Sequence, residues 1–295
     1  MKNKIILIFR KKKKDNNLFF MNNPINPMEK EIRPIDNATS FSTVDRRSTI
    51  LDIINQKGKI HVDELSKVFS VSEVTVRNDL KKLEKDGFLR RTHGGALKAN
   101  NVAFDMTLME KAKKHAEEKR AIGAKAAEMI YEGDTIILDS GTTTFEIARS
   151  IKEKKMKGIT VITNALNIAT ELAGIEGIGV VLTGGMLREK SFSLVGPHSE
   201  QTLKDYFGDK LFLGVDGICT DYGITTPNLL EAQVNRLMVE RSNEVIVVTD
   251  SSKFGRRSLC LIVDLNNVDK IITDRGISED DLNTLRSKEV EVCLV

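Results

Sequence analysis

The chain has 295 residues, of which 40% are hydrophobic, and its formal net charge is +3. This length allows two domains, and the apolar content is typical of a globular protein rather than a disordered one. No apolar run reaches the roughly 18 residues that a membrane helix needs, so the sequence predicts no membrane partner.

The three cysteines predict neither disulfides nor a metal centre. Cys219, Cys260 and Cys293 lie far apart, form no CxxC pair and have no histidine at a ligand spacing. Buried, reduced thiols in a cytoplasmic protein are therefore expected. We expect no bound metal and no cofactor.

Positive charge is concentrated in the N-terminal third of the chain. Residues 1–45 carry 9 basic and 5 acidic side chains, and residues 46–98 carry 12 and 7. The remainder, residues 99–295, carries 24 basic and 30 acidic side chains. A basic module followed by an acidic domain predicts that phosphate binding, and hence nucleic-acid binding, belongs to the first part only.

Residues 1–45 have an unusual composition. The apolar run 5–9 is shorter than the core of a signal peptide, which takes about 7–15 residues, and the basic run 10–14 follows it instead of preceding it. The asparagines and prolines of residues 22–27 oppose regular structure. We expect a disordered basic extension or a mis-assigned start, with Met28 as the alternative initiator and residues 1–27 then untranslated.

Two short helices are predicted next. Apolar residues recur at helical spacing in residues 46–56, which end at Lys57-Gly58-Lys59, and again in residues 62–69. The side chains expected to face inward are Ile50, Leu51, Ile54, Val62, Leu65 and Phe69.

A third helix is predicted behind Ser72, whose hydroxyl is a good N-cap. Val76, Leu80 and Leu83 recur at i, i+4 and i+7 and so share one buried stripe. Gly87 supplies the left-handed residue that ends many helices. The other faces carry hydroxyl, amide and cationic groups, which suit base edges and phosphates in a major groove.

Residues 88–97 are basic and contain the Gly94-Gly95 turn, which predicts a hairpin behind the third helix. Two helices joined by a tight turn, with a helix ahead and a hairpin behind, form a winged helix-turn-helix arrangement. A small helical interaction domain is the alternative, and the hairpin counts against it. The expected DNA contacts are Ser72, Thr75, Arg77, Asn78, Lys81, Lys82, Arg90, Arg91 and His93.

Beyond a helical connector at residues 106–114, strands and helices alternate. This order predicts a mainly parallel sheet wrapped by helices. The expected strands are 135–138, 160–162, 179–182, 211–215, 245–248, 270–272 and 291–295. The expected helices are 117–131, 143–151, 165–173, 198–206, 230–241 and 280–288.

Polar residues and glycines follow six of these strands, and the carboxyl ends of parallel strands share one crevice where ligands bind. Turn chemistry explains any one of them, because turns favour these residues, but six together favour a polar small-molecule site. The expected effector-binding residues are Asp139, Ser140, Gly141, Thr142, Thr143, Thr163, Asn164, Gly184, Gly185, Arg188, Asp216, Gly217 and Lys253.

Residues 140–143 are the most specific part of this set. A glycine and hydroxyls that lead into a helix N-terminus make an anion site suited to phosphate. The segment lacks the P-loop pattern, so nucleotide hydrolysis is not indicated. Arg188 and Lys253 could neutralise further charge, and Asp139 and Asp216 could accept sugar hydroxyls, although either acid could instead be a salt-bridge partner.

Several segments together resemble a known family. Residues 71–80 read VSEVTVRNDL and residues 93–96 read HGGA. Later segments read LDSGTT, TN, TGG, VDG and DSSKFG, at residues 138–143, 163–164, 183–185, 215–217 and 250–255. With these motifs, residues 45–295 resemble the DeoR-type family of bacterial transcriptional regulators. Asn78, where many members have a second arginine, and the phrases LDSGTTTFEIAR and VVTDSSKFGRRSL resemble the branch that controls N-acetylgalactosamine and other amino-sugar catabolism.

The resemblance implies an α/β protein with an N-terminal winged helix-turn-helix and a sensor domain similar in fold to ribose-5-phosphate isomerase. It implies a homo-oligomeric repressor, a dimer or tetramer, that binds operator DNA of a sugar operon and is released by a phosphorylated sugar. We expect the extension at 1–45, the DNA-binding domain at 46–100, a linker at 101–118, and the sensor and oligomerisation domain at 119–295.

Two alternatives remain open on this reading. The sensor fold is shared with sugar-phosphate isomerases and deaminases, which need an acid and a base in reach of the substrate. The isomerase loop carries a second acid soon after its Asp-Gly pair, whereas Ile218 and Cys219 follow Asp216-Gly217 here, so binding without turnover is expected. An activator of the same class is the other alternative.

Overall fold

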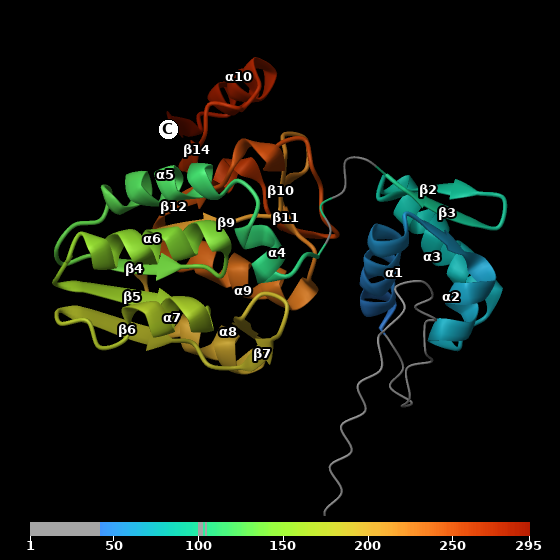
Figure 1. Ribbon diagram of the computed structural model, residues 1–295, viewed down its shortest axis with the longest axis horizontal. Coiled ribbons are helices and arrows are strands. Elements are labelled where there is room, and N and C mark those ends of the chain that lie inside the picture. Colours follow the sequence, from blue (N-terminus) through green and yellow to red (C-terminus); the bar gives the residue numbers. More distant parts are fainter. Residues whose placement is uncertain (1–41, 100–102, 104) are drawn as a thin grey trace, which may run out of the picture. The chain divides into compact units, whose positions relative to one another are not determined.

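The computed structural model describes residues 42–99, 103 and 105–295 (Figure 1). The expectations for residues 1–41 and for Met28 lie outside the described residues, but residues 43–45, which were expected to belong to the disordered extension, form the start of the first helix behind the N-cap Ser42. Within them, no helix is long and apolar enough to cross a membrane. In the same ranges, no cluster of three or more histidine, cysteine or acidic side chains could hold a metal ion, and the three cysteines are free thiols.

The first part of the described chain is a winged helix-turn-helix with its own core. Its helices are α1 Thr43–Lys57, α2 Val62–Phe69 and α3 Glu73–Lys85, and its strands are β1 Lys59–His61, β2 Leu89–Thr92 and β3 Gly95–Lys98. The inward-facing residues predicted for the three helices are all buried and form one cluster. The three predicted helices and the hairpin are therefore confirmed.

The wing contains a strand that the sequence did not reveal. The sequence predicted only that the first helix ends at Lys57-Gly58-Lys59. In the structure β1 begins at Lys59 and pairs antiparallel with β3, which gives the strand order β1-β3-β2. A Cβ on Gly95 would lie 2.0 Å from the carbonyl oxygen of Ile60, so only glycine allows the two strands to approach this closely.

A parallel sheet forms the centre of the second part. In the described chain it has seven strands in the order β15-β14-β12-β9-β4-β5-β6, and every neighbouring pair is parallel. These are the seven predicted strands, with bounds β4 Thr135–Leu138, β5 Ile159–Thr163, β6 Ile178–Leu182, β9 Gly208–Gly214, β12 Ser242–Val248, β14 Lys270–Thr273 and β15 Glu291–Leu294.

Helices cover both faces of this sheet. Alternate residues of one strand enter different clusters: Ile136 and Leu138 of β4 join one and Ile137 the other. The first cluster packs under α5, α6 and α7, and the second under α8, α9 and α10 (Figure 1). The bounds are α5 Ala116–Ala127, α6 Thr142–Glu153, α7 Leu166–Leu172, α8 Pro197–Lys204, α9 Leu229–Glu240 and α10 Glu279–Ser287.

Short strands outside the main sheet were not predicted. A hairpin of β7 Met186–Arg188 and β8 Ser193–Val195 follows β6. β10 Gly217–Cys219, β11 Gly223–Thr226 and β13 Cys260–Val263 form a small antiparallel sheet. The predicted connector helix is shorter than expected, since α4 spans only Leu108–Ala112.

The strand order places one special point in the sheet. From β4 the chain passes outward through β5 to β6 and then returns to β9, on the other side of β4, before it continues to β12, β14 and β15. The connections after β4 and after β9 therefore leave in opposite directions. Such a switch point opens a crevice at the carboxyl ends of the two strands.

Candidate functional site

The third helix of the N-terminal part presents a polar surface. Its N-cap is Ser72, whose Oγ accepts a hydrogen bond from the backbone N–H of Thr75 at 3.1 Å, as predicted. Asn78 and Lys81 are exposed, and within the described residues their side chains make no hydrogen bond or ion pair. Both side chains are therefore available to a ligand.

Two cations on this helix are paired along the helix itself. Arg77 lies 2.6 Å from Glu73, and Lys82 lies 2.9 Å from Asp86. Exposed pairs of this kind are worth little, about 0.3–0.5 kcal/mol, so a phosphate could replace either acid.

A buried carboxylate fixes the helix from behind. Asp79 accepts hydrogen bonds from Arg46 at 2.6 Å and from Arg47 at 2.8 Å, both on α1. The Asp79 side chain is only 3% exposed, so the interaction ties α1 to the inner face of α3. The opposite face of α3 is thereby held in a fixed direction.

The wing carries the remaining predicted DNA contacts. Arg90, Arg91 and His93 are all exposed, and the residue pairing of β2 with β3 leaves His93 in the two-residue turn. The backbone N–H of Arg91 donates to Glu84 of α3 at 2.8 Å, which joins the wing to the helix.

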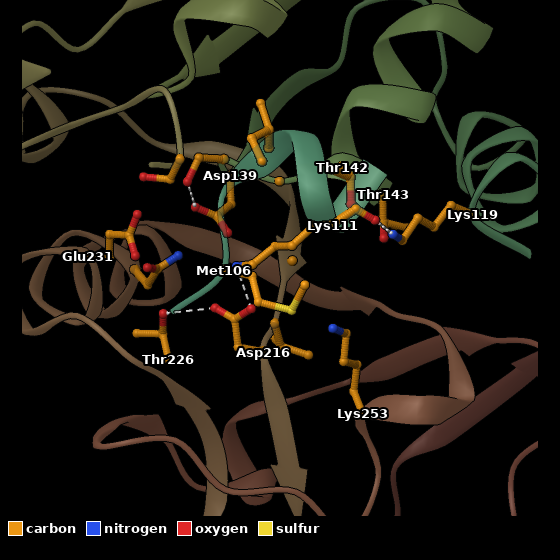
Figure 2. A pocket seen from close by; sticks show the side chains of 17 residues that line it. Met106, Lys111, Lys119, Asp139, Thr142, Thr143, Asp216, Thr226, Glu231 and Lys253 are labelled. Carbon is orange, nitrogen blue, oxygen red and sulfur yellow. Dashed lines mark hydrogen bonds and ion pairs between the residues drawn. The ribbon is translucent and has the colours of Figure 1, made fainter. Parts of the chain in front are cut away.

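The second site is a cavity at the switch point between β4 and β9 (Figure 2). The segment after β4, the end of β9 and the inner side of α9 line it, together with α4, α5 and the turn η1 Ser251–Lys253. Its volume is about 50 Å³. The lining residues are Met106, Leu108, Lys111, Lys119, Asp139, Ser140, Gly141, Thr142, Thr143, Ser191, Gly214, Val215, Asp216, Thr226, Glu231, Asn235 and Lys253.

Basic groups and a helix N-terminus form one part of this cavity. Ser140 to Thr143 lead into α6, whose first N–H groups have no partner within the helix. Lys119 and Lys253 line the cavity as well. Burial, opposed by nearby Asp250, lowers the pKa of Lys119 to about 8, and burial also lowers the pKa of Lys253.

Carboxylates form another part. Asp139, Asp216 and Glu231 are each less than 10% exposed. Burial, reinforced by the charge of Glu231, raises the pKa of Asp139 to about 8, so this carboxyl is mostly protonated at neutral pH. Burial opposes ionisation of Asp216 too, but Lys111 and Lys253 hold its pKa below the usual value.

An ion pair crosses the cavity. Lys111 of α4 extends to Asp216, with 2.5 Å between Nζ and Oδ1, and Thr226 donates to the other carboxylate oxygen at 3.3 Å (Figure 2). Burial disfavours the charged amine, but Asp216 and Glu231 raise the pKa of Lys111 above its usual value. Both partners are therefore charged.

Comparison with protein families assigns the two parts of the chain. Residues 46–102 match the DeoR-like helix-turn-helix domain, and residues 114–275 match the DeoR C-terminal sensor domain. The chain belongs to the DeoR family. It is therefore a DNA-binding transcriptional regulator with a sugar sensor domain, and not an enzyme.

Curated DeoR-type relatives align over most of their length. A candidate transcriptional repressor of the aga operon in Escherichia coli O157:H7 is 44% identical over 86% of this chain and 94% of that protein. The regulator GlpR of Haloferax volcanii is 37% identical over 84% of this chain and 96% of that protein. The repressor GlcR of Bacillus subtilis is 36% identical over 78% and 88%.

Solved structures give a weaker likeness. Ribose 5-phosphate isomerase from Plasmodium falciparum aligns with a TM-score of 0.33 and 18% identity, over 46% of this chain and 52% of the enzyme. The isomerase from Methanocaldococcus jannaschii gives 0.35 and 17%, over 48% and 55%. The chain thus spans about half the length of these enzymes, and scores of this size carry no argument about function.

The predicted effector residues of this DeoR-family chain divide into two groups. Seven of them line the cavity: Asp139, Ser140, Gly141, Thr142, Thr143, Asp216 and Lys253. The other six, Thr163, Asn164, Gly184, Gly185, Arg188 and Gly217, are not among its lining residues.

Five of the six members of the second group have neighbours elsewhere that bear on their position, and the exception is Gly184. Thr163 donates to the carbonyl of Leu138 at 2.7 Å, which joins β5 to β4. A Cβ on Gly185 would lie 2.6 Å from the carbonyl oxygen of Val195, and one on Gly217 would lie 2.6 Å from that of Arg256.

The two remaining polar members are held by neighbouring chain segments. Arg188 pairs with Asp105 at 2.5 Å and with Glu231 at 3.1 Å. Asn164 donates to the carbonyl of Leu194 at 3.5 Å.

Most of the cavity residues that lie away from strand ends were not predicted from the sequence. Lys111 and Lys119 lie on helices that precede the sheet, and Glu231 and Asn235 lie on α9. The signal for α9 was weak: Glu231 and Asn235 are four residues apart and therefore lie on one face, but Gln233, Arg236 and Glu240 make the helix polar elsewhere as well. No local signal marks Lys111, since lysines are ordinary in an exposed connector.

Proposed function

We propose that this DeoR-family chain represses a sugar-catabolic operon and is released from its operator by a phosphorylated sugar bound at the switch point between β4 and β9. The observation that carries this proposal is the division of one cavity into a basic part at a helix N-terminus and a carboxylate part. A sugar phosphate has the matching division, with an anion at one end and hydroxyls along the rest.

The phosphate would bind at residues 140–143. The unpartnered N–H groups of α6 and the hydroxyls of Thr142 and Thr143 supply donors, and the helix dipole favours a negative group. Lys119 and Lys253 supply opposite charge from the neighbouring walls. A neutral sugar would leave these cations without a partner, which is why we infer a phosphorylated ligand.

The sugar hydroxyls would bind at the carboxylates. Asp216 and Glu231 accept hydrogen bonds, whereas protonated Asp139 can also donate one. Asn235 adds an amide that both donates and accepts. We include amino-sugar operons among the regulated targets, because a relative 44% identical is a candidate repressor of the aga operon and because the carboxylates also suit an ammonium group.

Operator DNA would be bound by α3 and the wing. Asn78 can bond bidentately to an adenine edge, and Arg77 can bond to a guanine edge or a phosphate after leaving Glu73. Ser72, Thr75, Lys81 and Lys82 would contact the flanking backbone, as would Arg90, Arg91 and His93 of the wing.

We extend the proposal to the assembly and location of the protein. Repeated half-sites require a homo-oligomer, and we assign its formation to the sensor domain, with DNA binding at 46–100, the linker at 101–118 and the sensor at 119–295. A repressor of an operon works where the chromosome is, so we expect a cytoplasmic protein. Sedimentation analysis should give a dimer or tetramer.

The test combines selected DNA with a ligand panel. Purified protein selects its operator from random duplex DNA, and fluorescence anisotropy then follows binding in the presence of ribose 5-phosphate, glucosamine 6-phosphate, galactosamine 6-phosphate and their unphosphorylated sugars. We expect at least one phosphate ester to weaken DNA binding at least fivefold and to stabilise the protein by about 2.7 kcal/mol at 100 times its Kd. Equal effects of sugar and sugar phosphate would contradict the phosphate assignment, and tighter DNA binding with ligand would make the protein an activator or co-repressed regulator.

A further inference from the structure

One helix of the linker occupies part of the proposed effector site. α4 lies within residues 103–113, between the two stretches that match the DeoR family models. Three of the cavity's lining residues come from this segment: Met106, Leu108 and Lys111. The same short segment thus connects the DNA-binding domain to the sensor and closes the sensor's cavity.

The cavity in this arrangement is too small for the proposed effector. Its volume is about 50 Å³, enough for a few water molecules. Pockets that bury small ligands have volumes of roughly 300–1,000 Å³. A sugar phosphate therefore needs the side chains of this segment to leave.

The groups that a sugar phosphate needs are also the groups that hold α4. Asp216 is paired with Lys111 at 2.5 Å. Lys119 donates from Nζ to two carbonyl oxygens at the end of the segment, those of Lys111 at 2.5 Å and Lys114 at 2.6 Å. A ligand phosphate on Lys119 and a ligand hydroxyl on Asp216 would compete for both attachments.

Further contacts join the linker to the sensor at intervals. The backbone N–H of Ala103 donates to the carbonyl of Arg257 at 3.0 Å, and that of Leu108 to the carbonyl of Lys190 at 2.6 Å. Asp105 lies between Arg188 and Lys190, at 2.5 and 3.1 Å. These contacts of Ala103, Asp105 and Leu108 lie outside the cavity. The contacts of Lys111 and Lys119 hold the rest of the segment inside the cavity, so their loss would loosen α4.

We propose that α4 and the effector exclude each other: Lys111 holds the cavity closed when no effector is bound, and a phosphorylated sugar releases α4 and with it the linker to the DNA-binding domain. This inference rests on the proposed function and adds its coupling element. By linkage, whatever weakens the docking of α4 strengthens effector binding by the same factor.

The first measurement is hydrogen exchange of the α4 backbone. Using the full chain and the member of the ligand panel that binds it most tightly, we expect exchange at Leu108 and Lys111 to become at least tenfold faster on binding. Unchanged or slower exchange, with binding intact, would overturn the proposal while leaving the proposed function in place. Absence of binding by every sugar phosphate in the panel would overturn both.

Two variants separate displacement from direct contact. Lys111→Met removes the ion pair, and Thr107→Ala removes the N-cap of α4, where the Thr107 hydroxyl accepts from the Glu110 N–H and the Glu110 carboxylate accepts from the Thr107 N–H. Thr107 does not line the cavity, so its loss acts only through the helix. If α4 competes with the effector, both variants should bind the sugar phosphate more tightly, by about fivefold for the lost cap.

The opposite result has a clear meaning. If Lys111 were itself a ligand of the phosphate, Lys111→Met would weaken effector binding and Thr107→Ala would not strengthen it, which would overturn the proposal. Lys113→Met is the matched control, since the exposed side chain of Lys113 follows the last residue of the same helix and makes no hydrogen bond or ion pair within the described residues. Its effector affinity and α4 exchange should remain within twofold of the unmodified protein.

Discussion

The guanidinium of Arg46 lies 2.6 Å from the carboxylate of Asp79, and both side chains are almost completely buried. Arg47 completes the arrangement at 2.8 Å. Replacing Asp79 with asparagine should lower the free energy of unfolding of the DNA-binding domain by about 3 kcal/mol, because two arginines lose a buried counter-charge. Urea unfolding checks this value.

The control for this substitution is an exposed acid on the same helix. Glu73→Gln breaks the exposed pair with Arg77 and removes a negative charge from the first turn of the helix, so it should cost no more than about 1.5 kcal/mol. Similar losses for the two variants would show that the buried pair does not hold α3 in place.

Asn78 and Lys81 should separate sequence reading from backbone binding. Asn78→Ala should cost about 1–3 kcal/mol on the selected operator and relax specificity at one base position. Lys81→Ala should weaken binding to all duplexes alike and reduce the salt dependence by about one ion. Binding to operator variants at several salt concentrations measures both effects, and identical profiles for the two variants would refute the assigned roles.

The helix N-terminus of the cavity should be necessary for the response to effector. A chain with Thr142→Ala and Thr143→Ala keeps the DNA-binding domain intact, so operator affinity should stay within about twofold. Release by the sugar phosphate should need at least tenfold more ligand, because two hydroxyl donors are lost. Thr170→Ala on α7, whose hydroxyl donates to the Leu166 carbonyl, serves as the control. Normal release in the double variant would contradict the phosphate site.

Asp139 should make stability depend on pH. Its pKa is raised from 3.8 to about 8 in the fold, so between these values the folded chain keeps a proton that the unfolded chain has lost. Stability from this group is complete below about pH 4 and is lost as the pH rises towards 8, with a limiting slope of about 1.4 kcal/mol per pH unit. Denaturation of Asp139→Asn should show a smaller decline over pH 5–8.

An exposed acid provides the comparison for this pH series. Asp221→Asn changes the same chemical group at the surface and should leave the decline unchanged. A decline of equal slope in Asp139→Asn and in the unmodified chain would mean that other groups cause it.

The local elements of this protein could be read from its sequence. Ser72 begins α3 because a hydroxyl at an N-cap satisfies a backbone N–H that has no other partner, and Val76, Leu80 and Leu83 are buried because their spacing places them on one face. The seven strands of the main sheet were identified by their apolar runs, and the motifs sufficed for the family. Short strands such as β1 were missed, since three residues carry too little pattern.

The cavity depended on the order of the strands, which no local pattern encodes. The sequence marked six polar strand ends as candidates, with residues 140–143 as the most specific, but the cavity opens at the switch point between β4 and β9, so Asp139 and Asp216 line it while Thr163, at the end of the neighbouring β5, does not. Lys111 becomes part of the site because it forms an ion pair with Asp216, 105 positions later in the chain. This pair holds the connector, whose sequence is typical of an exposed segment, in the crevice of the sheet. Sequence periodicity determines which face of each element is buried; only the long-range pairing of those faces decides which polar groups meet.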